Sequence, residues 1–86
     1  MKPGYTPHPD VMFQRVGDRM VLVNLETNLV FELNETGARV WELIRSGAGH
    51  EEILDHLTAE FEVEREQLRA DLDDLLRALA AKGLIS

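Results

Sequence analysis

The chain contains no cysteine, so disulfide bonds, thiolate nucleophiles and cysteine-ligated zinc are all excluded. It has no apolar run approaching the ~18 residues that a membrane-spanning helix needs. Its first five residues, MKPGY, lack the apolar core of a signal peptide. Serine occurs only at positions 46 and 86, neither beside a candidate base, which argues against nucleophilic catalysis. We therefore expect a cytoplasmic protein without a cofactor or a membrane partner.

Basic side chains are scarce: nine Lys and Arg stand against 16 Asp and Glu, for a net charge of −7. The acidic residues gather between Glu51 and Asp74, in a stretch whose only basic residues besides histidine are Arg65 and Arg69. Such a field repels nucleic-acid backbones and favours a basic partner, although solvated helix surfaces are often equally acidic. We expect no nucleic-acid partner.

Candidate sites for metal binding and catalysis are few. His50 and His56 are six residues apart, whereas two ligands on one helix face stand four apart. Asp71, Asp73 and Asp74 form an acidic group, but no pocket or second cluster supports acid–base chemistry there. We expect neither catalytic nor metal-binding residues, and hence no enzyme.

With 86 residues the chain has room for a single hydrophobic core. Prolines at positions 3, 7 and 9 predict a flexible, extended arm over residues 1–10, followed by one domain over residues 11–86. Hydrophobic patterning with turn signals predicts strands at 11–16, 20–23 and 29–33, and a hairpin at Gly17-Asp18. Helical spacing predicts helices starting at residue 35, at 49 or 50, and at 65, the last running to about residue 82. The fold class is α+β, with a three-stranded antiparallel sheet followed by three helices (βββααα), like a winged helix-turn-helix.

The strand at residues 29–33 is apolar on both faces and is followed at once by Asn34, a good helix N-cap. A three-stranded sheet has two edges, and this strand is expected to form one of them. Edge strands are usually protected by Lys, Pro or bulges, and this one is not. It could therefore accept a strand from another molecule.

The chain resembles the PqqD family, whose fold is also called a RiPP recognition element. The similarity covers residues 8–86 and depends on the order of several short motifs, none decisive alone. These are Val21-Leu22-Val23, the run from Phe31 through Asn34 and Trp41 to Ile44, Gly47, Glu51-Glu52-Ile53, Phe61-Glu62-Val63, Asp71-Leu72, Leu75-Leu76-x-x-Leu79 and Gly83-Leu84-Ile85. Two positions depart from the pattern: Gly49 stands where Thr or Ser is frequent, and Asp or Pro is frequent near Glu64.

The resemblance implies binding of the leader segment of a ribosomally made precursor peptide. The leader would join the sheet beside the third strand, in a groove against the third helix, and would be presented to a leader peptidase or other modifying enzyme. The chain looks most like the separate leader-binding protein of split lasso-peptide clusters. A PqqD serving a radical enzyme in quinone cofactor assembly is the nearest alternative, and a homo-oligomer or weak homodimer formed through the same edge is a third.

The expected peptide-binding residues come from the third strand and from one shoulder of the last helix. The two shoulders of that helix carry Arg69/Asp73/Leu76/Ala80 and Asp71/Leu75/Ala78/Lys82, and we favour the first. The predicted set is Leu29, Val30, Phe31, Glu32, Leu33, Arg69, Leu72, Asp73, Leu76 and Ala80.

Overall fold

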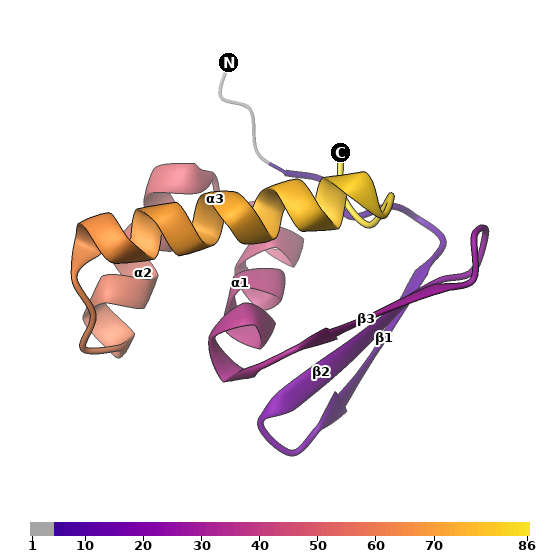
Figure 1. Cartoon of the computed structure of the whole chain (residues 1–86), viewed down its shortest axis with the longest axis horizontal. Coiled ribbons are helices and arrows are strands. Elements are labelled where there is room, and N and C mark those ends of the chain that lie inside the picture. The colour runs from indigo at the N-terminus through magenta and orange to yellow at the C-terminus, as the bar shows by residue number, and fades with distance from the viewer. Residues whose placement is uncertain (1–4) are drawn as a thin grey trace.

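A computed structural model gives the structure of the chain and describes residues 5–86. Three strands are followed by three helices: β1 (Val11–Val16), β2 (Arg19–Asn24), β3 (Leu29–Leu33), α1 (Glu35–Arg45), α2 (His50–Glu60) and α3 (Arg65–Ala81). The helices lie on one side of the sheet, as Figure 1 shows. The predicted α+β class and the βββααα order are confirmed. None of the helices within residues 5–86 is both long and apolar enough to cross a membrane.

The sheet is an antiparallel meander with strand order β1-β2-β3. Gly17 has a φ of 65° and closes the two-residue β1–β2 turn, because primed turns need a positive φ that glycine adopts without strain. Asn28, at φ 62°, closes the longer turn before β3. The continuous apolar run of β2 is central, as predicted, and β1 and β3 are the two edges.

Hydrogen-bonded pairs alternate along each antiparallel ladder. Val16 and Arg19 face each other across the two-residue turn, so they form a bonded pair. At the other end of the hairpin, the Leu25 N–H donates to the Asp10 C=O, so the same alternation of bonded pairs holds there. Residues 20, 22 and 24 of β2 must then turn their backbone groups toward β3.

One core joins the sheet to the helices. Its largest fully buried side chains come from β2 and all three helices, and they include Leu22, Trp41, Ile53, Leu57, Leu72 and Leu79. The Asn34 side chain accepts a hydrogen bond from the Gly37 N–H at 2.9 Å, which confirms the predicted N-cap of α1. At the start of α2, Gly49 has no side chain to cap with, and its own N–H donates to the Glu52 carboxylate at 2.8 Å.

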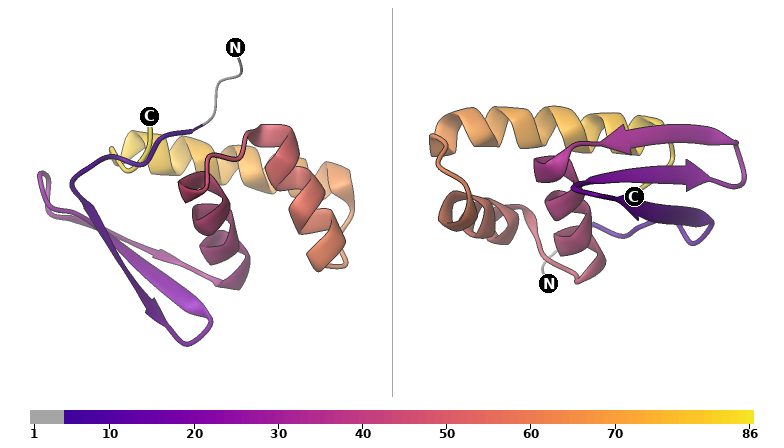
Figure 2. Two further views of the ribbon diagram at one scale, coloured as in Figure 1. Left: turned by 180° about the vertical axis from the view of Figure 1, so that it is seen from behind. Right: turned by 90° about the horizontal axis from the view of Figure 1, so that it is seen from below.

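The two ends of the described chain pair with each other. The Thr6 N–H donates to the Ser86 carbonyl, the Ser86 N–H to the Thr6 carbonyl, and the His8 N–H to the Leu84 carbonyl. Leu84 and Ile85 are buried after Gly83 (φ 70°), as expected for the apolar contact of a helix C-cap. Residues 6–8 of the predicted arm therefore lie along the C-terminal residues, whereas residues 1–4 lie outside the described part. Figure 2 shows the arm running beside the C-terminus, and the backbone of residues 6 and 8 bonds to the C-terminal residues rather than to β3.

Candidate functional site

The outer edge of β3 carries free backbone groups. Leu29, Phe31 and Leu33 pair with β2, so the N–H and C=O groups of Val30 and Glu32 point away from the sheet. Within residues 5–86, neither Val30 nor Glu32 makes a backbone hydrogen bond outside the sheet. The Val30 side chain is 61% exposed, and no helix covers it. This edge can accept another strand.

The opposite edge, β1, is better protected. Arg15 shares the inward face of the sheet with Phe13 and donates to the Glu42 carboxylate of α1. The guanidinium of Arg45 lies 4.2 Å from the centre of the Phe13 ring. Inward-pointing charges of this kind are a common way to prevent edge-to-edge pairing. Both edges of the sheet have free backbone groups, but they are not equivalent, because only β3 adjoins the cavity against α3.

The ion-pair network beside β1 makes stability depend on pH. Glu42 accepts hydrogen bonds from Arg15 and Arg39, and these guanidinium groups hold the pKa of Glu42 below its ordinary value of 4.5. A carboxylate with a lowered pKa stabilises the folded state above its ordinary pKa, and this contribution disappears as the pH falls through the lowered value.

Replacing Glu42 by Gln should therefore lower the free energy of unfolding at pH 7 but not at about pH 2. Because the Glu42 side chain is 37% exposed, solvent screening limits the expected loss to at most about 1 kcal/mol. Urea unfolding at several pH values would measure it. Glu62→Gln is the matched control, since Glu62 makes no ion pair within the described residues. An equal loss for both variants at pH 7 would contradict the network.

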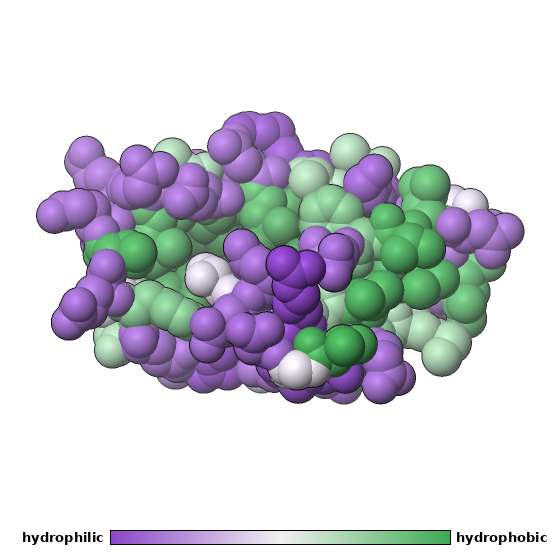
Figure 3. Space-filling model, turned by 60° about the horizontal axis from the view of Figure 1, so that its bottom comes forward, coloured by the Kyte–Doolittle hydropathy of each residue, from purple (hydrophilic) through white to green (hydrophobic). Residues whose placement is uncertain are grey.

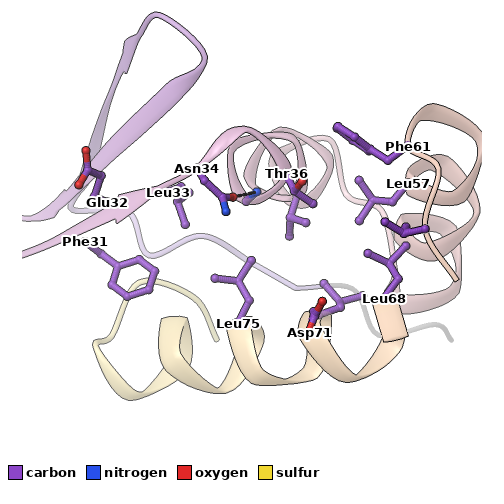
Figure 4. Close-up of a pocket in the computed structure, with 14 residues that line it drawn as sticks. Phe31, Glu32, Leu33, Asn34, Thr36, Leu57, Phe61, Leu68, Asp71 and Leu75 are labelled. Atoms are coloured by element: carbon purple, nitrogen blue, oxygen red, sulfur yellow. Dashed lines mark hydrogen bonds between the residues drawn. The ribbon is translucent and has the colours of Figure 1, made fainter. Parts of the chain in front are cut away.

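A cavity of about 390 Å³ lies between β3 and α3 and reaches the end of α2. Phe31 and Leu75 point toward one another across it, while Glu32 points to the other side of the strand (Figure 4). The lining is mostly apolar: Phe31, Leu33, Val40, Leu57, Phe61, Val63, Leu68, Leu72 and Leu75, with Glu32, Asn34, Thr36, Gly37 and Asp71. An apolar groove beside a free strand edge can hold an extended peptide and bury one or more of its side chains.

Four members of the predicted peptide-binding set line this cavity: Phe31, Glu32, Leu33 and Leu72. Leu29 and Val30 continue the same strand edge away from it. Phe31 packs against the core.

The structure brings the other shoulder of α3 to the groove. Asp71 and Leu75 line the cavity, and the ammonium of Lys82 lies 5.8 Å from the centre of the Phe31 ring. On the shoulder that we favoured, Arg69 pairs with Glu51 and Asp73 pairs with His50.

The remaining two residues of that shoulder also lie outside the groove: Leu76 is buried in the core and Ala80 is exposed to solvent. Apart from Leu72 at its centre, the stripe that we favoured therefore supplies no residue to the cavity lining. The residues at the end of α2 were not anticipated, because nothing in their local pattern distinguishes them from ordinary core and loop positions.

One group of residues outside the groove could in principle hold a cation. Side-chain atoms of His8, Asp10 and Glu26 lie within 4.8 Å of one another. However, His8 Nδ1 accepts a hydrogen bond from the Asp10 N–H, so the neutral ring carries its proton on Nε2, 3.4 Å from the Glu26 carboxylate. A protonated nitrogen is not a ligand, so this arrangement is that of a polar contact between the arm and the β2–β3 turn.

Comparison with known proteins identifies a matching family and two similar structures. A family model described as coenzyme PQQ synthesis protein D (PqqD) matches residues 19–85. The structure of TbiB1 in complex with the TbiA(beta) leader peptide is similar, with 38% identity and a TM-score of 0.88 over 94% of each chain. Lasso peptide synthetase B1 complexed with the leader peptide has a TM-score of 0.87 at 24% identity, over 98% of this chain and 99% of that one, and supports the fold alone. A search of curated proteins gave no match.

The matched segment begins at β2 and ends just before the last residue, so it includes β3, the three helices and every residue that lines the cavity. On this match the chain belongs to the PqqD family.

Proposed function

We propose that this protein binds the leader segment of a ribosomally synthesised precursor peptide and presents it to a leader peptidase or other modifying enzyme of lasso peptide biosynthesis. The leader adds to the sheet as a strand beside β3 and lies in the groove against α3. The observation that carries the proposal is the free row of backbone groups at Val30 and Glu32, next to an apolar cavity. The 38% identity to a protein solved with a leader peptide supports the same role.

Two kinds of interaction would contribute to recognition of the peptide: main-chain pairing and burial of side chains. Each backbone hydrogen bond contributes about 0.5–1.5 kcal/mol and makes little demand on the sequence of the guest. Burying one large apolar side chain in the cavity stabilises the complex by about 1.5–3 kcal/mol and selects for that side chain. The role proposed is non-catalytic, because binding and orientation of the peptide require no reactive group from this chain.

The test begins with the genes beside the coding sequence. A short open reading frame next to a transglutaminase-like peptidase and an asparagine-synthetase-like cyclase would identify the precursor, and its leader can be synthesised. We expect calorimetry to show one leader per protein chain, with no binding of a scrambled leader. Absence of binding to the neighbouring leader would overturn the proposal.

A second function is favoured by the family description itself, which names a quinone cofactor pathway. In that case the groove would serve a precursor peptide destined for a radical enzyme. A radical enzyme encoded beside this gene, with no cyclase present, would favour this second function.

A further inference from the structure

One row of residues on α3 and its C-cap runs beside the groove and β3. Asp71, Leu75, Ala78 and Lys82 are spaced by four, three and four residues, so they lie on one face of the helix. Asp71 and Leu75 line the cavity near Leu33, and Lys82 lies over Phe31. The row is therefore acidic at one end, apolar in the middle and basic at the other end.

The charges at both ends of this row have no ion-pair partner. Within residues 5–86, Asp71 accepts a hydrogen bond from the Gln67 amide but has no cation within 4 Å. Lys82 has no carboxylate within 4 Å in the same part of the chain. Most other charged residues of α3 are paired, namely Arg65, Arg69, Asp73, Asp74 and Arg77. Glu66 is also unpaired, but it is exposed and lies outside the cavity lining.

We infer that Asp71 and Lys82 select the guest peptide by its charge polarity, a property of the binding function proposed above. A basic guest residue would meet Asp71, and an acidic one would meet Lys82. The two positions are 11 residues apart, or about 16 Å along a helix that rises about 1.5 Å per residue. A strand rises about 3.4 Å per residue and its side chains alternate between two faces, so two guest residues that both face α3 across this distance stand about four or six positions apart.

The order of the two charges follows from the direction of β3. This strand passes Lys82 at Phe31 and runs toward the Asp71 end of the cavity, where Asp71 lies near Thr36, beyond the end of β3 (Figure 4). Every pair in the sheet is antiparallel, and antiparallel pairing is slightly more stable than parallel pairing. An antiparallel guest runs from Asp71 toward Lys82, so its basic residue precedes its acidic one.

The test uses a display library of random 14-residue peptides selected on the immobilised protein. We expect enriched peptides to carry Lys or Arg about four or six residues before Asp or Glu. One enriched peptide is then made in two versions that differ only by exchange of these two residues. The original should bind about three- to tenfold more tightly, as expected for two exposed ion pairs, and the difference should shrink at about 0.5 M salt.

Two double variants test which residues select the charge order, and each exchanges one acidic and one basic residue. Asp71→Lys with Lys82→Glu should reverse the preference between the two peptides. Asp74→Lys with Arg77→Glu should leave it unchanged, because this pair makes the same change of charge outside the cavity lining. Peptides that are enriched but show no charge order, or the same order on the reversed protein, would overturn this inference alone. If no peptide is enriched, or if Val30→Pro does not weaken the enriched ones, the proposed function fails as well.

Discussion

Replacing Val30 by proline should strongly weaken binding of the leader while the fold survives. The Val30 N–H points away from the sheet, so proline removes one donor to the guest strand without breaking the β2–β3 ladder. An unsatisfied guest carbonyl costs about 1–3 kcal/mol, which weakens binding roughly 5- to 150-fold. The proline ring also hinders the approach of the guest strand. Calorimetry with the synthetic leader would measure the loss, and urea unfolding should show a decrease of no more than about 1 kcal/mol.

The matched control is Arg15→Pro on the other edge of the sheet. Arg15 of β1 also directs its backbone N–H outward, because Gln14 and Val16 are the residues bonded to β2 there. This variant should cost comparable stability, including the lost contact with Glu42, yet bind the leader as the wild type does. Weak binding by Arg15→Pro together with normal binding by Val30→Pro would move the site to β1.

Replacing Trp41 by alanine should remove a large share of the free energy of unfolding of the protein. Trp41 is 1% exposed and meets the Phe13 ring edge-on at a centroid distance of 6.4 Å. Truncating a buried tryptophan costs about 3–5 kcal/mol, which is a large share of the roughly 5–15 kcal/mol that stabilises a typical domain. Urea unfolding followed by circular dichroism would measure the loss.

Trp41→Phe separates packing from hydrogen bonding at the same position. The indole Nε1 of Trp41 is buried without a hydrogen-bond partner in residues 5–86. Phenylalanine keeps an aromatic ring against Phe13 and removes this unsatisfied donor, which offsets part of the lost packing. We expect a loss below about 2 kcal/mol. A loss as large as that of Trp41→Ala would show that the indole N–H makes a bond in solution that the structure does not contain.

The fold was predictable because its local signals agree with one another. Gly17 supplied a positive φ between two apolar runs, Asn34 capped a helix directly after a strand, and Gly83 ended the last helix before two apolar residues. Each of these signals depends on residues close together in the sequence, so no tertiary information was needed. The strands and helices accordingly begin and end within one or two residues of their expected positions.

The strand side of the groove was predictable, but which shoulder of α3 lines it was not. Which shoulder of α3 faces β3 depends on how the helix is rotated, and both shoulders combine charged and apolar residues. The rotation is set by distant contacts such as the hydrogen bond between His50 and Asp73, 23 residues apart at 2.8 Å. His50 is half-buried and joins the start of α2 to α3, a contact that its local sequence does not indicate.

The face of the sheet opposite the helices carries exposed apolar side chains. A protein that binds peptides through the neighbouring strand edge must therefore avoid binding its own copies. Met12 and Val30 lie in register with Val23 between them and are largely exposed, and Figure 3 shows apolar surface gathered over the strands. An unpaired strand edge beside such an apolar surface can bind another copy of the protein as well as a peptide. It therefore favours self-association. The net charge of −7 makes copies repel one another, and this repulsion weakens as added electrolyte shortens its range to about 10 Å at 0.1 M. We therefore expect added electrolyte to favour association of copies, because the acidic residues of α2 and α3 supply much of the repulsion.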